Sequence, residues 1–158
     1  MSDAARKTTH DRALEAVRGY ANHDAVAVGD ALTGLEDDRW IEVYAVLSGL
    51  LRSTISIMEL TGERWKLCHL VRYVDEVSAA APPHYEFAIA AAARAWADGD
   101  ESALLAMARH DLVGAVHMTA VFVVVTGHAL WGASGFHAVL REFQETAAEL
   151  VEDPASGI

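Results

Sequence analysis

The chain has 158 residues, of which 53% are hydrophobic and 22% charged, so it can bury the core of one domain. This composition excludes a disordered chain and a collagen-like repeat, and the single cysteine excludes an intramolecular disulfide. The formal net charge of −11 argues against binding to nucleic acid or to an anionic membrane, because phosphate-directed proteins need a basic surface. Alanine fills 30 positions and proline only three, which favours helices.

The first half of the chain is expected to form four helices after a loose tail at residues 1–7. Asp, Ser and Thr residues that can cap a helix, and glycines that can end one, set the expected boundaries. These signals predict helices from Thr8 or Thr9 to Asn22, from Asp24 to about Gly34, from Glu36 to Thr61, and from about Glu63 to Ala80.

The second half is expected to form four more helices. Pro82 and Pro83 end the fourth helix and begin the fifth, since proline suits the first helical position. A turn is expected at 98–100 and a loop at 132–135. The predicted helices run from Pro83 to Ala97, from Asp100 to about His110, from Asp111 to Gly132, and from about Phe136 to Val151.

One apolar segment raises two alternatives to a buried helix. The β-branched run from Val121 to Thr126 alone indicates a strand, but no second run of that kind exists to pair with it. The segment 112–131 is also long enough to cross a bilayer. Its internal His117 and His128, and the lack of a flanking Lys/Arg cluster, favour a buried central helix over a membrane span.

We therefore predict an all-α antiparallel bundle of about seven to eight helices, in one domain that covers residues 1–158. Within it, the segment Ala16–Asp24 resembles Ala92–Asp100 at an offset of 76 residues, with identical Ala, Arg and Asp positions. Two interpretations stay open. Either two alanine-rich helices are similar by chance, or an internal duplication relates residues 9–80 to residues 83–152.

The predicted third helix carries more apolar surface than one neighbouring layer covers, because an amphipathic helix normally buries a single stripe of about 100°. One apolar stripe consists of Ile41, Tyr44, Leu47, Leu51, Ile55 and Met58. The second consists of Val43, Val46, Leu50, Ile57 and Leu60. A homodimer is the preferred interpretation, since two-fold interfaces are the commonest way to cover such a face.

The motifs of common enzymes and metal proteins are absent. The chain has no His-Glu-x-x-His, no paired Glu-x-x-His, no phosphate-binding loop, no Gly-x-Gly-x-x-Gly and no Gly-x-Ser-x-Gly. Neither catalysis nor a cofactor is predicted. The single Cys68, together with a start that lacks the apolar run of a signal peptide, predicts a cytoplasmic location. The excess of arginine over lysine suggests a bacterial origin.

The eight histidines are the most suggestive polar feature. On a continuous helix, His110, His117 and His128 share one stripe, but about 10 and 16 Å separate them along the axis, too far for one metal ion. His117 lies inside the uncharged segment, where a buried imidazole needs a partner. The simplest interpretation is a core histidine that bonds to a backbone carbonyl or a tyrosine.

Three functions follow from these features. The preferred one is a non-catalytic interaction or scaffold protein that self-associates and offers an acidic surface to a protein partner. That surface would consist of Asp37, Asp38, Glu42, Glu142, Glu145, Glu149 and Glu152. The alternative is a small-ligand-binding protein or enzyme with a pocket near His117, lined by His117, His128, Arg52, His69 and Tyr73. A metal-binding bundle is the second alternative, although no ligand set is identified for it.

Overall fold

The computed structural model describes residues 3–62 and 73–152, with side chains described for residues 9–62 and 73–146. Within these residues the protein is all-α, as predicted, and contains no strand. The helices are α1 (Asp3–Ala21), α2 (Ala25–Leu32), α3 (Asp37–Thr61), α5 (Val74–Ser78), α6 (Pro83–Ala97), α7 (Ser102–His110) and α8 (Leu112–Glu152).

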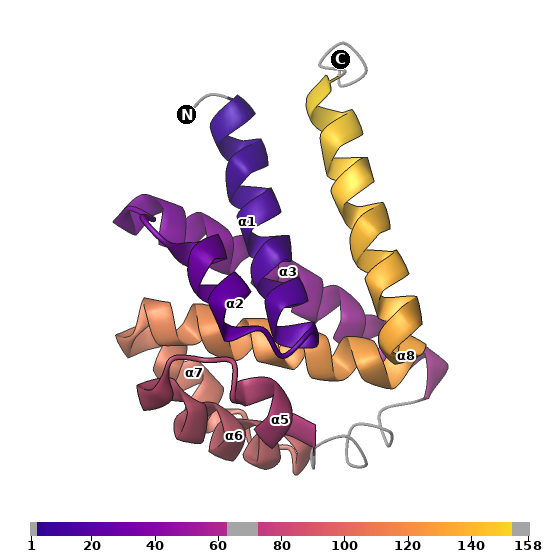
Figure 1. Cartoon of the computed structure of the whole chain (residues 1–158). Coiled ribbons are helices and arrows are strands. Elements are labelled where there is room, and N and C mark those ends of the chain that lie inside the picture. The colour runs from indigo at the N-terminus through magenta and orange to yellow at the C-terminus, as the bar shows by residue number, and fades with distance from the viewer. Residues whose placement is uncertain (1–2, 63–72, 153–158) are drawn as a thin grey trace.

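The first part of α8 forms the centre of the fold. Figure 1 shows it crossing the middle of the molecule, with α1–α3 above it and α5–α7 below it. Every residue from Ala115 to Thr126 is at most 5% exposed, because neighbours cover the helix on all sides. The ring of Trp96 from α6 stacks on Phe122 at a centroid distance of 4.7 Å. The prediction of a buried central helix is confirmed.

The run that indicated a strand is helical. Thr126 bonds through its hydroxyl to the Phe122 carbonyl at 2.8 Å, which satisfies a polar group inside the apolar core. By length and composition, both α3 and the Leu112–Thr146 part of α8 are apolar enough to cross a membrane. The most apolar window of α8 is nevertheless 83% buried within the protein, whereas that of α3 is only 33% buried.

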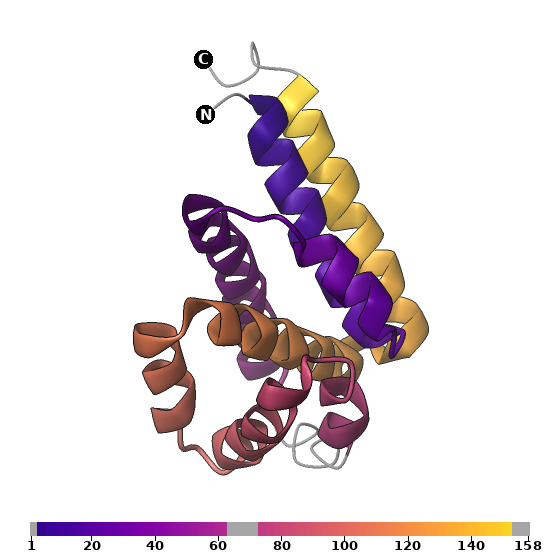
Figure 2. The same ribbon diagram turned by 60° about the vertical axis from the view of Figure 1, so that its left-hand side comes forward.

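A kink at Gly132 divides α8. The glycine has φ 71° and ψ 172°, a conformation that residues with a Cβ atom rarely adopt, and the helix resumes directly after it. The predicted loop at 132–135 is therefore wrong, because one glycine makes the whole bend. Figures 1 and 2 show the C-terminal part of α8 leaving the central part at a steep angle.

The helix-capping residues act largely as predicted. Asp24 accepts a hydrogen bond from the Ala27 amide at 3.0 Å and begins α2. Gly62 ends α3 in the left-handed conformation, with φ 69°. Pro83 is the first residue of α6. Asp100 accepts a bond from the Ser102 amide at 3.0 Å before α7 begins.

One predicted boundary and one predicted arrangement of histidines are wrong. The helix α1 begins at Asp3, so residues 3–7 are not a loose tail, because Ala4, Ala5 and their neighbours are strong helix formers. Asp111 has an extended conformation between α7 and α8. His110 therefore lies on a different helix from His117 and His128, and the predicted three-histidine stripe does not exist. Of the predicted fourth helix, residues 63–72 lie outside the described part of the chain.

The long helix α3 buries one stripe that combines members of both predicted stripes. Its buried residues are Val43, Leu47, Leu50, Leu51, Thr54 and Met58. A bond of 3.2 Å between the hydroxyls of Thr54 and Thr126 joins this stripe to α8. The rest of the helix surface is more open, with Ile41 58%, Ile57 37% and Leu60 87% exposed.

Candidate functional site

His117 occupies a polar position inside the apolar centre of α8. Its Nδ1 atom lies 2.6 Å from the hydroxyl of Tyr20, which α1 brings to the same place. Both residues are buried, with His117 5% exposed and Tyr20 fully covered. This pair is the predicted core histidine bonded to a tyrosine. When Tyr20 donates its proton to Nδ1, the imidazole hydrogen is on Nε2.

A second tyrosine extends this polar group to α6. The ring of Tyr85 lies 5.7 Å from the ring of His117, and its hydroxyl donates to Asp111 Oδ1 at 3.1 Å. Asp111 also accepts a bond from the Gly114 amide at 3.0 Å, which caps the beginning of α8. A Cβ atom at Gly114 would meet the Tyr85 ring at 2.8 Å, so only glycine permits this close approach.

Burial keeps the imidazole of His117 neutral. Its removal from water, with a smaller effect of the nearby His84 charge, lowers the pKa of His117 to about 4. Burial and the bond to Asp111 raise the pKa of Tyr85 to about 12. The pKa of Tyr20 is raised as well, by burial. At neutral pH the three groups are uncharged, so the bond between Tyr20 and His117 joins α1 to α8 without a buried charge.

A small cavity brings two of the predicted pocket residues together. It has a volume of about 50 Å³, and its walls are Tyr73, Val77, Val125 and His128. The Nε2 atom of His128 is buried and has no hydrogen-bond partner among the described residues. Burial, together with the charges of His137 and His23, lowers the pKa of His128, so this imidazole is neutral at pH 7.

The other predicted pocket residues do not join this cavity. His117 precedes His128 by 11 residues on α8, about 16 Å along the axis, and lines neither this cavity nor the groove described below. Arg52 is exposed on α3, and His69 lies outside the described residues. The structure thus separates the predicted pocket into a buried pair at His117 and a cavity at His128.

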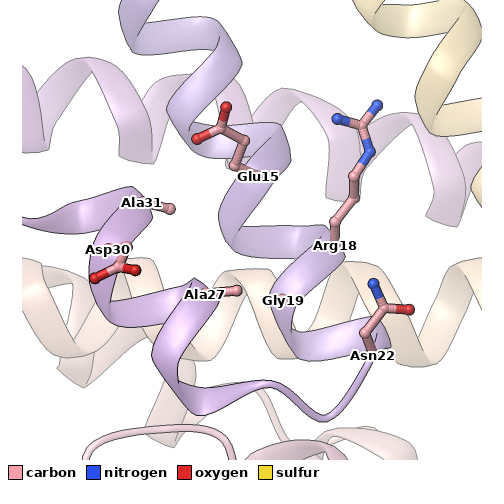
Figure 3. Close-up of a pocket in the computed structure, with 7 residues that line it drawn as sticks. All are labelled: Glu15, Arg18, Gly19, Asn22, Ala27, Asp30 and Ala31. Atoms are coloured by element: carbon pink, nitrogen blue, oxygen red, sulfur yellow. The ribbon is translucent and has the colours of Figure 1, made fainter.

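An open groove of about 390 Å³ lies between α1 and α2, and no sequence signal indicated it. Figure 3 shows carboxylates on its two helices, Glu15 from α1 and Asp30 from α2, with Ala27 and Ala31 turned toward α1. Arg18 points from the groove toward α8, where it donates to Gln144 at 2.6 Å. The helices touch at Gly19, whose position leaves no room for a Cβ atom beside Val28.

The predicted acidic surface consists of two separate groups. The exposed Asp37 and Asp38 begin α3, whereas Glu142 and Glu145 are exposed on the last part of α8. The Thr54–Thr126 bond places the other end of α3 near the kink, so the two groups lie far apart (Figure 1). The side chains of Glu149 and Glu152 lie outside the described residues.

No set of three or more His, Cys, Asp or Glu side chains in the described part of the chain is close enough to hold a metal ion. Comparison with known proteins adds no assignment for this fold: no family model matches the chain, and neither the curated proteins nor the solved structures contain a match. The function must therefore be argued from the surfaces and side chains described above.

Proposed function

We propose that this protein is a non-catalytic interaction protein that self-associates through the outer face of α3. The outer face is the exposed side of that helix, which carries Ile41, Ala45, Gly49, Arg52, Ser53, Ser56, Ile57, Glu59 and Leu60. The observation that supports the proposal is the incomplete burial of α3. Its most apolar window is 33% buried, against 83% for α8, although both helices have the hydropathy of core segments.

The charges on α3 favour a second copy of this chain as the partner. Between residues 39 and 60 the helix carries two basic residues, Arg39 and Arg52, and two acidic ones, Glu42 and Glu59. The segment is therefore formally neutral in a chain with a net charge of −11. Asp37 and Asp38 at the start of α3 bring the whole helix to a formal charge of −2. Two acidic chains repel each other least where the local charge is smallest, so the part of α3 after Asp38 is a favourable place for them to meet.

The size and shape of the face also suit a helix pair. The helix α3 has 25 residues and extends about 37 Å, which is long enough for a standard interface of about 800 Å² on each partner. Gly49 is exposed near the middle, and nothing lies within 4 Å of the position of its absent Cβ atom. Glu142 and Glu145 lie on the last part of α8 and not on α3, so they stay available in such a dimer to receive a basic protein partner.

Charged side chains on the outer face test this proposal. We expect the double variant Ile57→Lys/Leu60→Lys to be monomeric at concentrations where the wild type is dimeric, because two lysines from each copy would be buried without partners. Light scattering coupled to size-exclusion chromatography measures the change, and circular dichroism shows whether the fold is kept.

The matched control is Val26→Lys, which places a lysine at an apolar residue of α2 that is 72% exposed but off the outer face. It should leave the oligomeric state unchanged. A double variant that remains dimeric, or a control that dissociates equally, would place the contact elsewhere and reject the role of α3.

Binding of a small neutral ligand at His128 is the second candidate function. The unpartnered Nε2 atom favours it, because buried polar atoms nearly always have a partner. A volume of about 50 Å³ exceeds the space for one water molecule, so a compound of a few heavy atoms fits. Titration with short-chain alcohols, followed by the ring nitrogen shifts of His128 in NMR spectra, tests this candidate. Unchanged shifts would reject it for this ligand class.

We also propose that the chain arose by duplication, with residues 9–80 related to residues 83–152. Both halves contain a helix, a tight turn with a capping aspartate, a short helix and a long apolar helix. The matching aromatic residues, Tyr20 and Trp96, are both buried. An experimental structure in which α1–α3 do not superimpose on α6–α8 would reject the duplication.

A further inference from the structure

The part of α8 beyond the kink, residues 133–152, turns away from the central part at a steep angle, and its first turn packs against that central part. We call it the C-terminal arm. Phe136 of the arm lies against Gly127, where a Cβ atom would collide with its ring. Nine residues separate the two positions, about 13 Å along a straight helix, so this contact exists only because of the kink. Phe136 also packs edge-on against His128, with a centroid distance of 5.4 Å.

The arm also has a specific binding surface on α1. Arg18 donates to Gln144 Oε1 at 2.6 Å, and Gln144 Nε2 donates to Asp11 at 3.4 Å. Figure 2 shows the arm running beside α1. Phe136 is 1% exposed and Leu140 is fully covered, so the interface has both an apolar part and a polar part. The protein thus carries two complementary surfaces. One is on the arm, and the other, which we call the seat, is formed by α1 and the central part of α8.

We propose that two copies of this chain exchange their C-terminal arms, with Gly132 as the hinge. Residues on both sides of Gly132 are helical, so straightening this one residue gives a continuous helix of 41 residues. The arm then points away from its own body and occupies the same seat on a second copy. All contacts of the arm are kept in this dimer except those at the hinge, so the hinge conformation decides between the two forms.

Arm exchange is distinct from contact through the outer face of α3, because the exchanged arm is a segment that already fits its binding surface on α1 and α8. Whether the arms exchange also depends on the backbone conformation of one residue, Gly132. Glycine tolerates φ 71° with ψ 172°, whereas a residue with a Cβ atom prefers the straight helix. Exchange should therefore increase when Gly132 is replaced and decrease when the hinge is made longer.

The experiment compares two hinge variants in the Ile57→Lys/Leu60→Lys background, in which association through α3 is removed. The first is Gly132→Ala, and the second has two glycines inserted after Gly132. Each protein is refolded at high concentration, and light scattering measures the ratio of dimer to monomer. Gly132→Ala should raise this ratio at least about tenfold, since the strained hinge is relieved in both copies. The insertion should lower it below that of the parent.

The contact between Arg18 and Gln144 distinguishes an arm-exchanged dimer from any other dimer. In a sample that mixes isotope-labelled and unlabelled chains, the Gln144 amide of one copy should show a nuclear Overhauser effect to Arg18 of the other. Gly29→Ala is the control, because Gly29 lies in α2 with open space at its Cβ position and should not change the ratio. Monomers in every variant, or dimers in which Gln144 contacts only its own Arg18, would overturn the proposal. Without refolding, the parent is expected to stay monomeric, because each arm must first leave its own seat. If Gly132→Ala fails to fold, a parent protein that gives only monomers after refolding at high concentration would overturn the arm exchange equally.

Discussion

Lowering the pH from neutral to about 4 should reduce the free energy of unfolding by about 3 kcal/mol through His117 alone. The folded pKa of about 4 lies below the ordinary value of 6.5, so the unfolded chain takes up the proton first. The contribution of His117 is fully present above pH 6.5 and is lost as the pH falls through 4. Burial lowers the pKa of His10 and of His128 too, and both act in the same direction.

Urea unfolding at a series of pH values measures this loss. The matched variants are His117→Gln, which removes the titrating group but keeps a hydrogen-bonding side chain, and His110→Gln, which changes an exposed histidine on α7. The first should flatten the dependence of stability on pH, and the second should change it little. Equal slopes in the wild type and in His117→Gln would show that the buried imidazole is not the group that titrates.

Removing the Phe136 ring should cost about 3–5 kcal/mol of the free energy of unfolding. The ring is 1% exposed and lies among Gly127, His128 and Trp131, so Phe136→Ala leaves a cavity at the bend of α8. Phe143→Ala on the same arm is the control, because Phe143 is 37% exposed and should contribute much less.

Chemical denaturation of the two variants gives the comparison directly. A large loss for Phe136→Ala with a small loss for Phe143→Ala would confirm that the C-terminal arm is part of the core. Similar small losses in both variants would mean that the arm is not held against the central part of α8.

The helical class and most helix ends could be predicted because they depend on local signals. Asp24 caps α2 and Gly62 ends α3 through contacts within a few residues, so their roles are visible in the sequence. The end of the central helix was predicted at the correct glycine, but as a loop over 132–135 and not as a bend at one residue. A loop and a one-residue bend both begin with glycine, and the packing of Phe136 on Gly127, nine residues away, distinguishes them.

The partners of His117 could not be predicted, because tertiary packing brings them together. Tyr20 is 97 residues away in the sequence, and the sequence indicated only that the partner would be a backbone carbonyl or some tyrosine. Asp111 was predicted as a helix cap, and its second bond, to Tyr85, depends on the approach of α6 to α8. Equally, the stripe of α3 that is buried depends on where α8 crosses it, since both predicted stripes were apolar.

The central claim is that α3 presents its outer face to a second copy of the chain. Sedimentation equilibrium of the wild type, from about 1 to 100 µM, tests it most directly, since this range covers the dissociation constants of ordinary weak dimers. We expect twice the mass of one chain at the upper concentrations, and the single-chain mass for Ile57→Lys/Leu60→Lys. A wild type that remains a single chain throughout the range would contradict it.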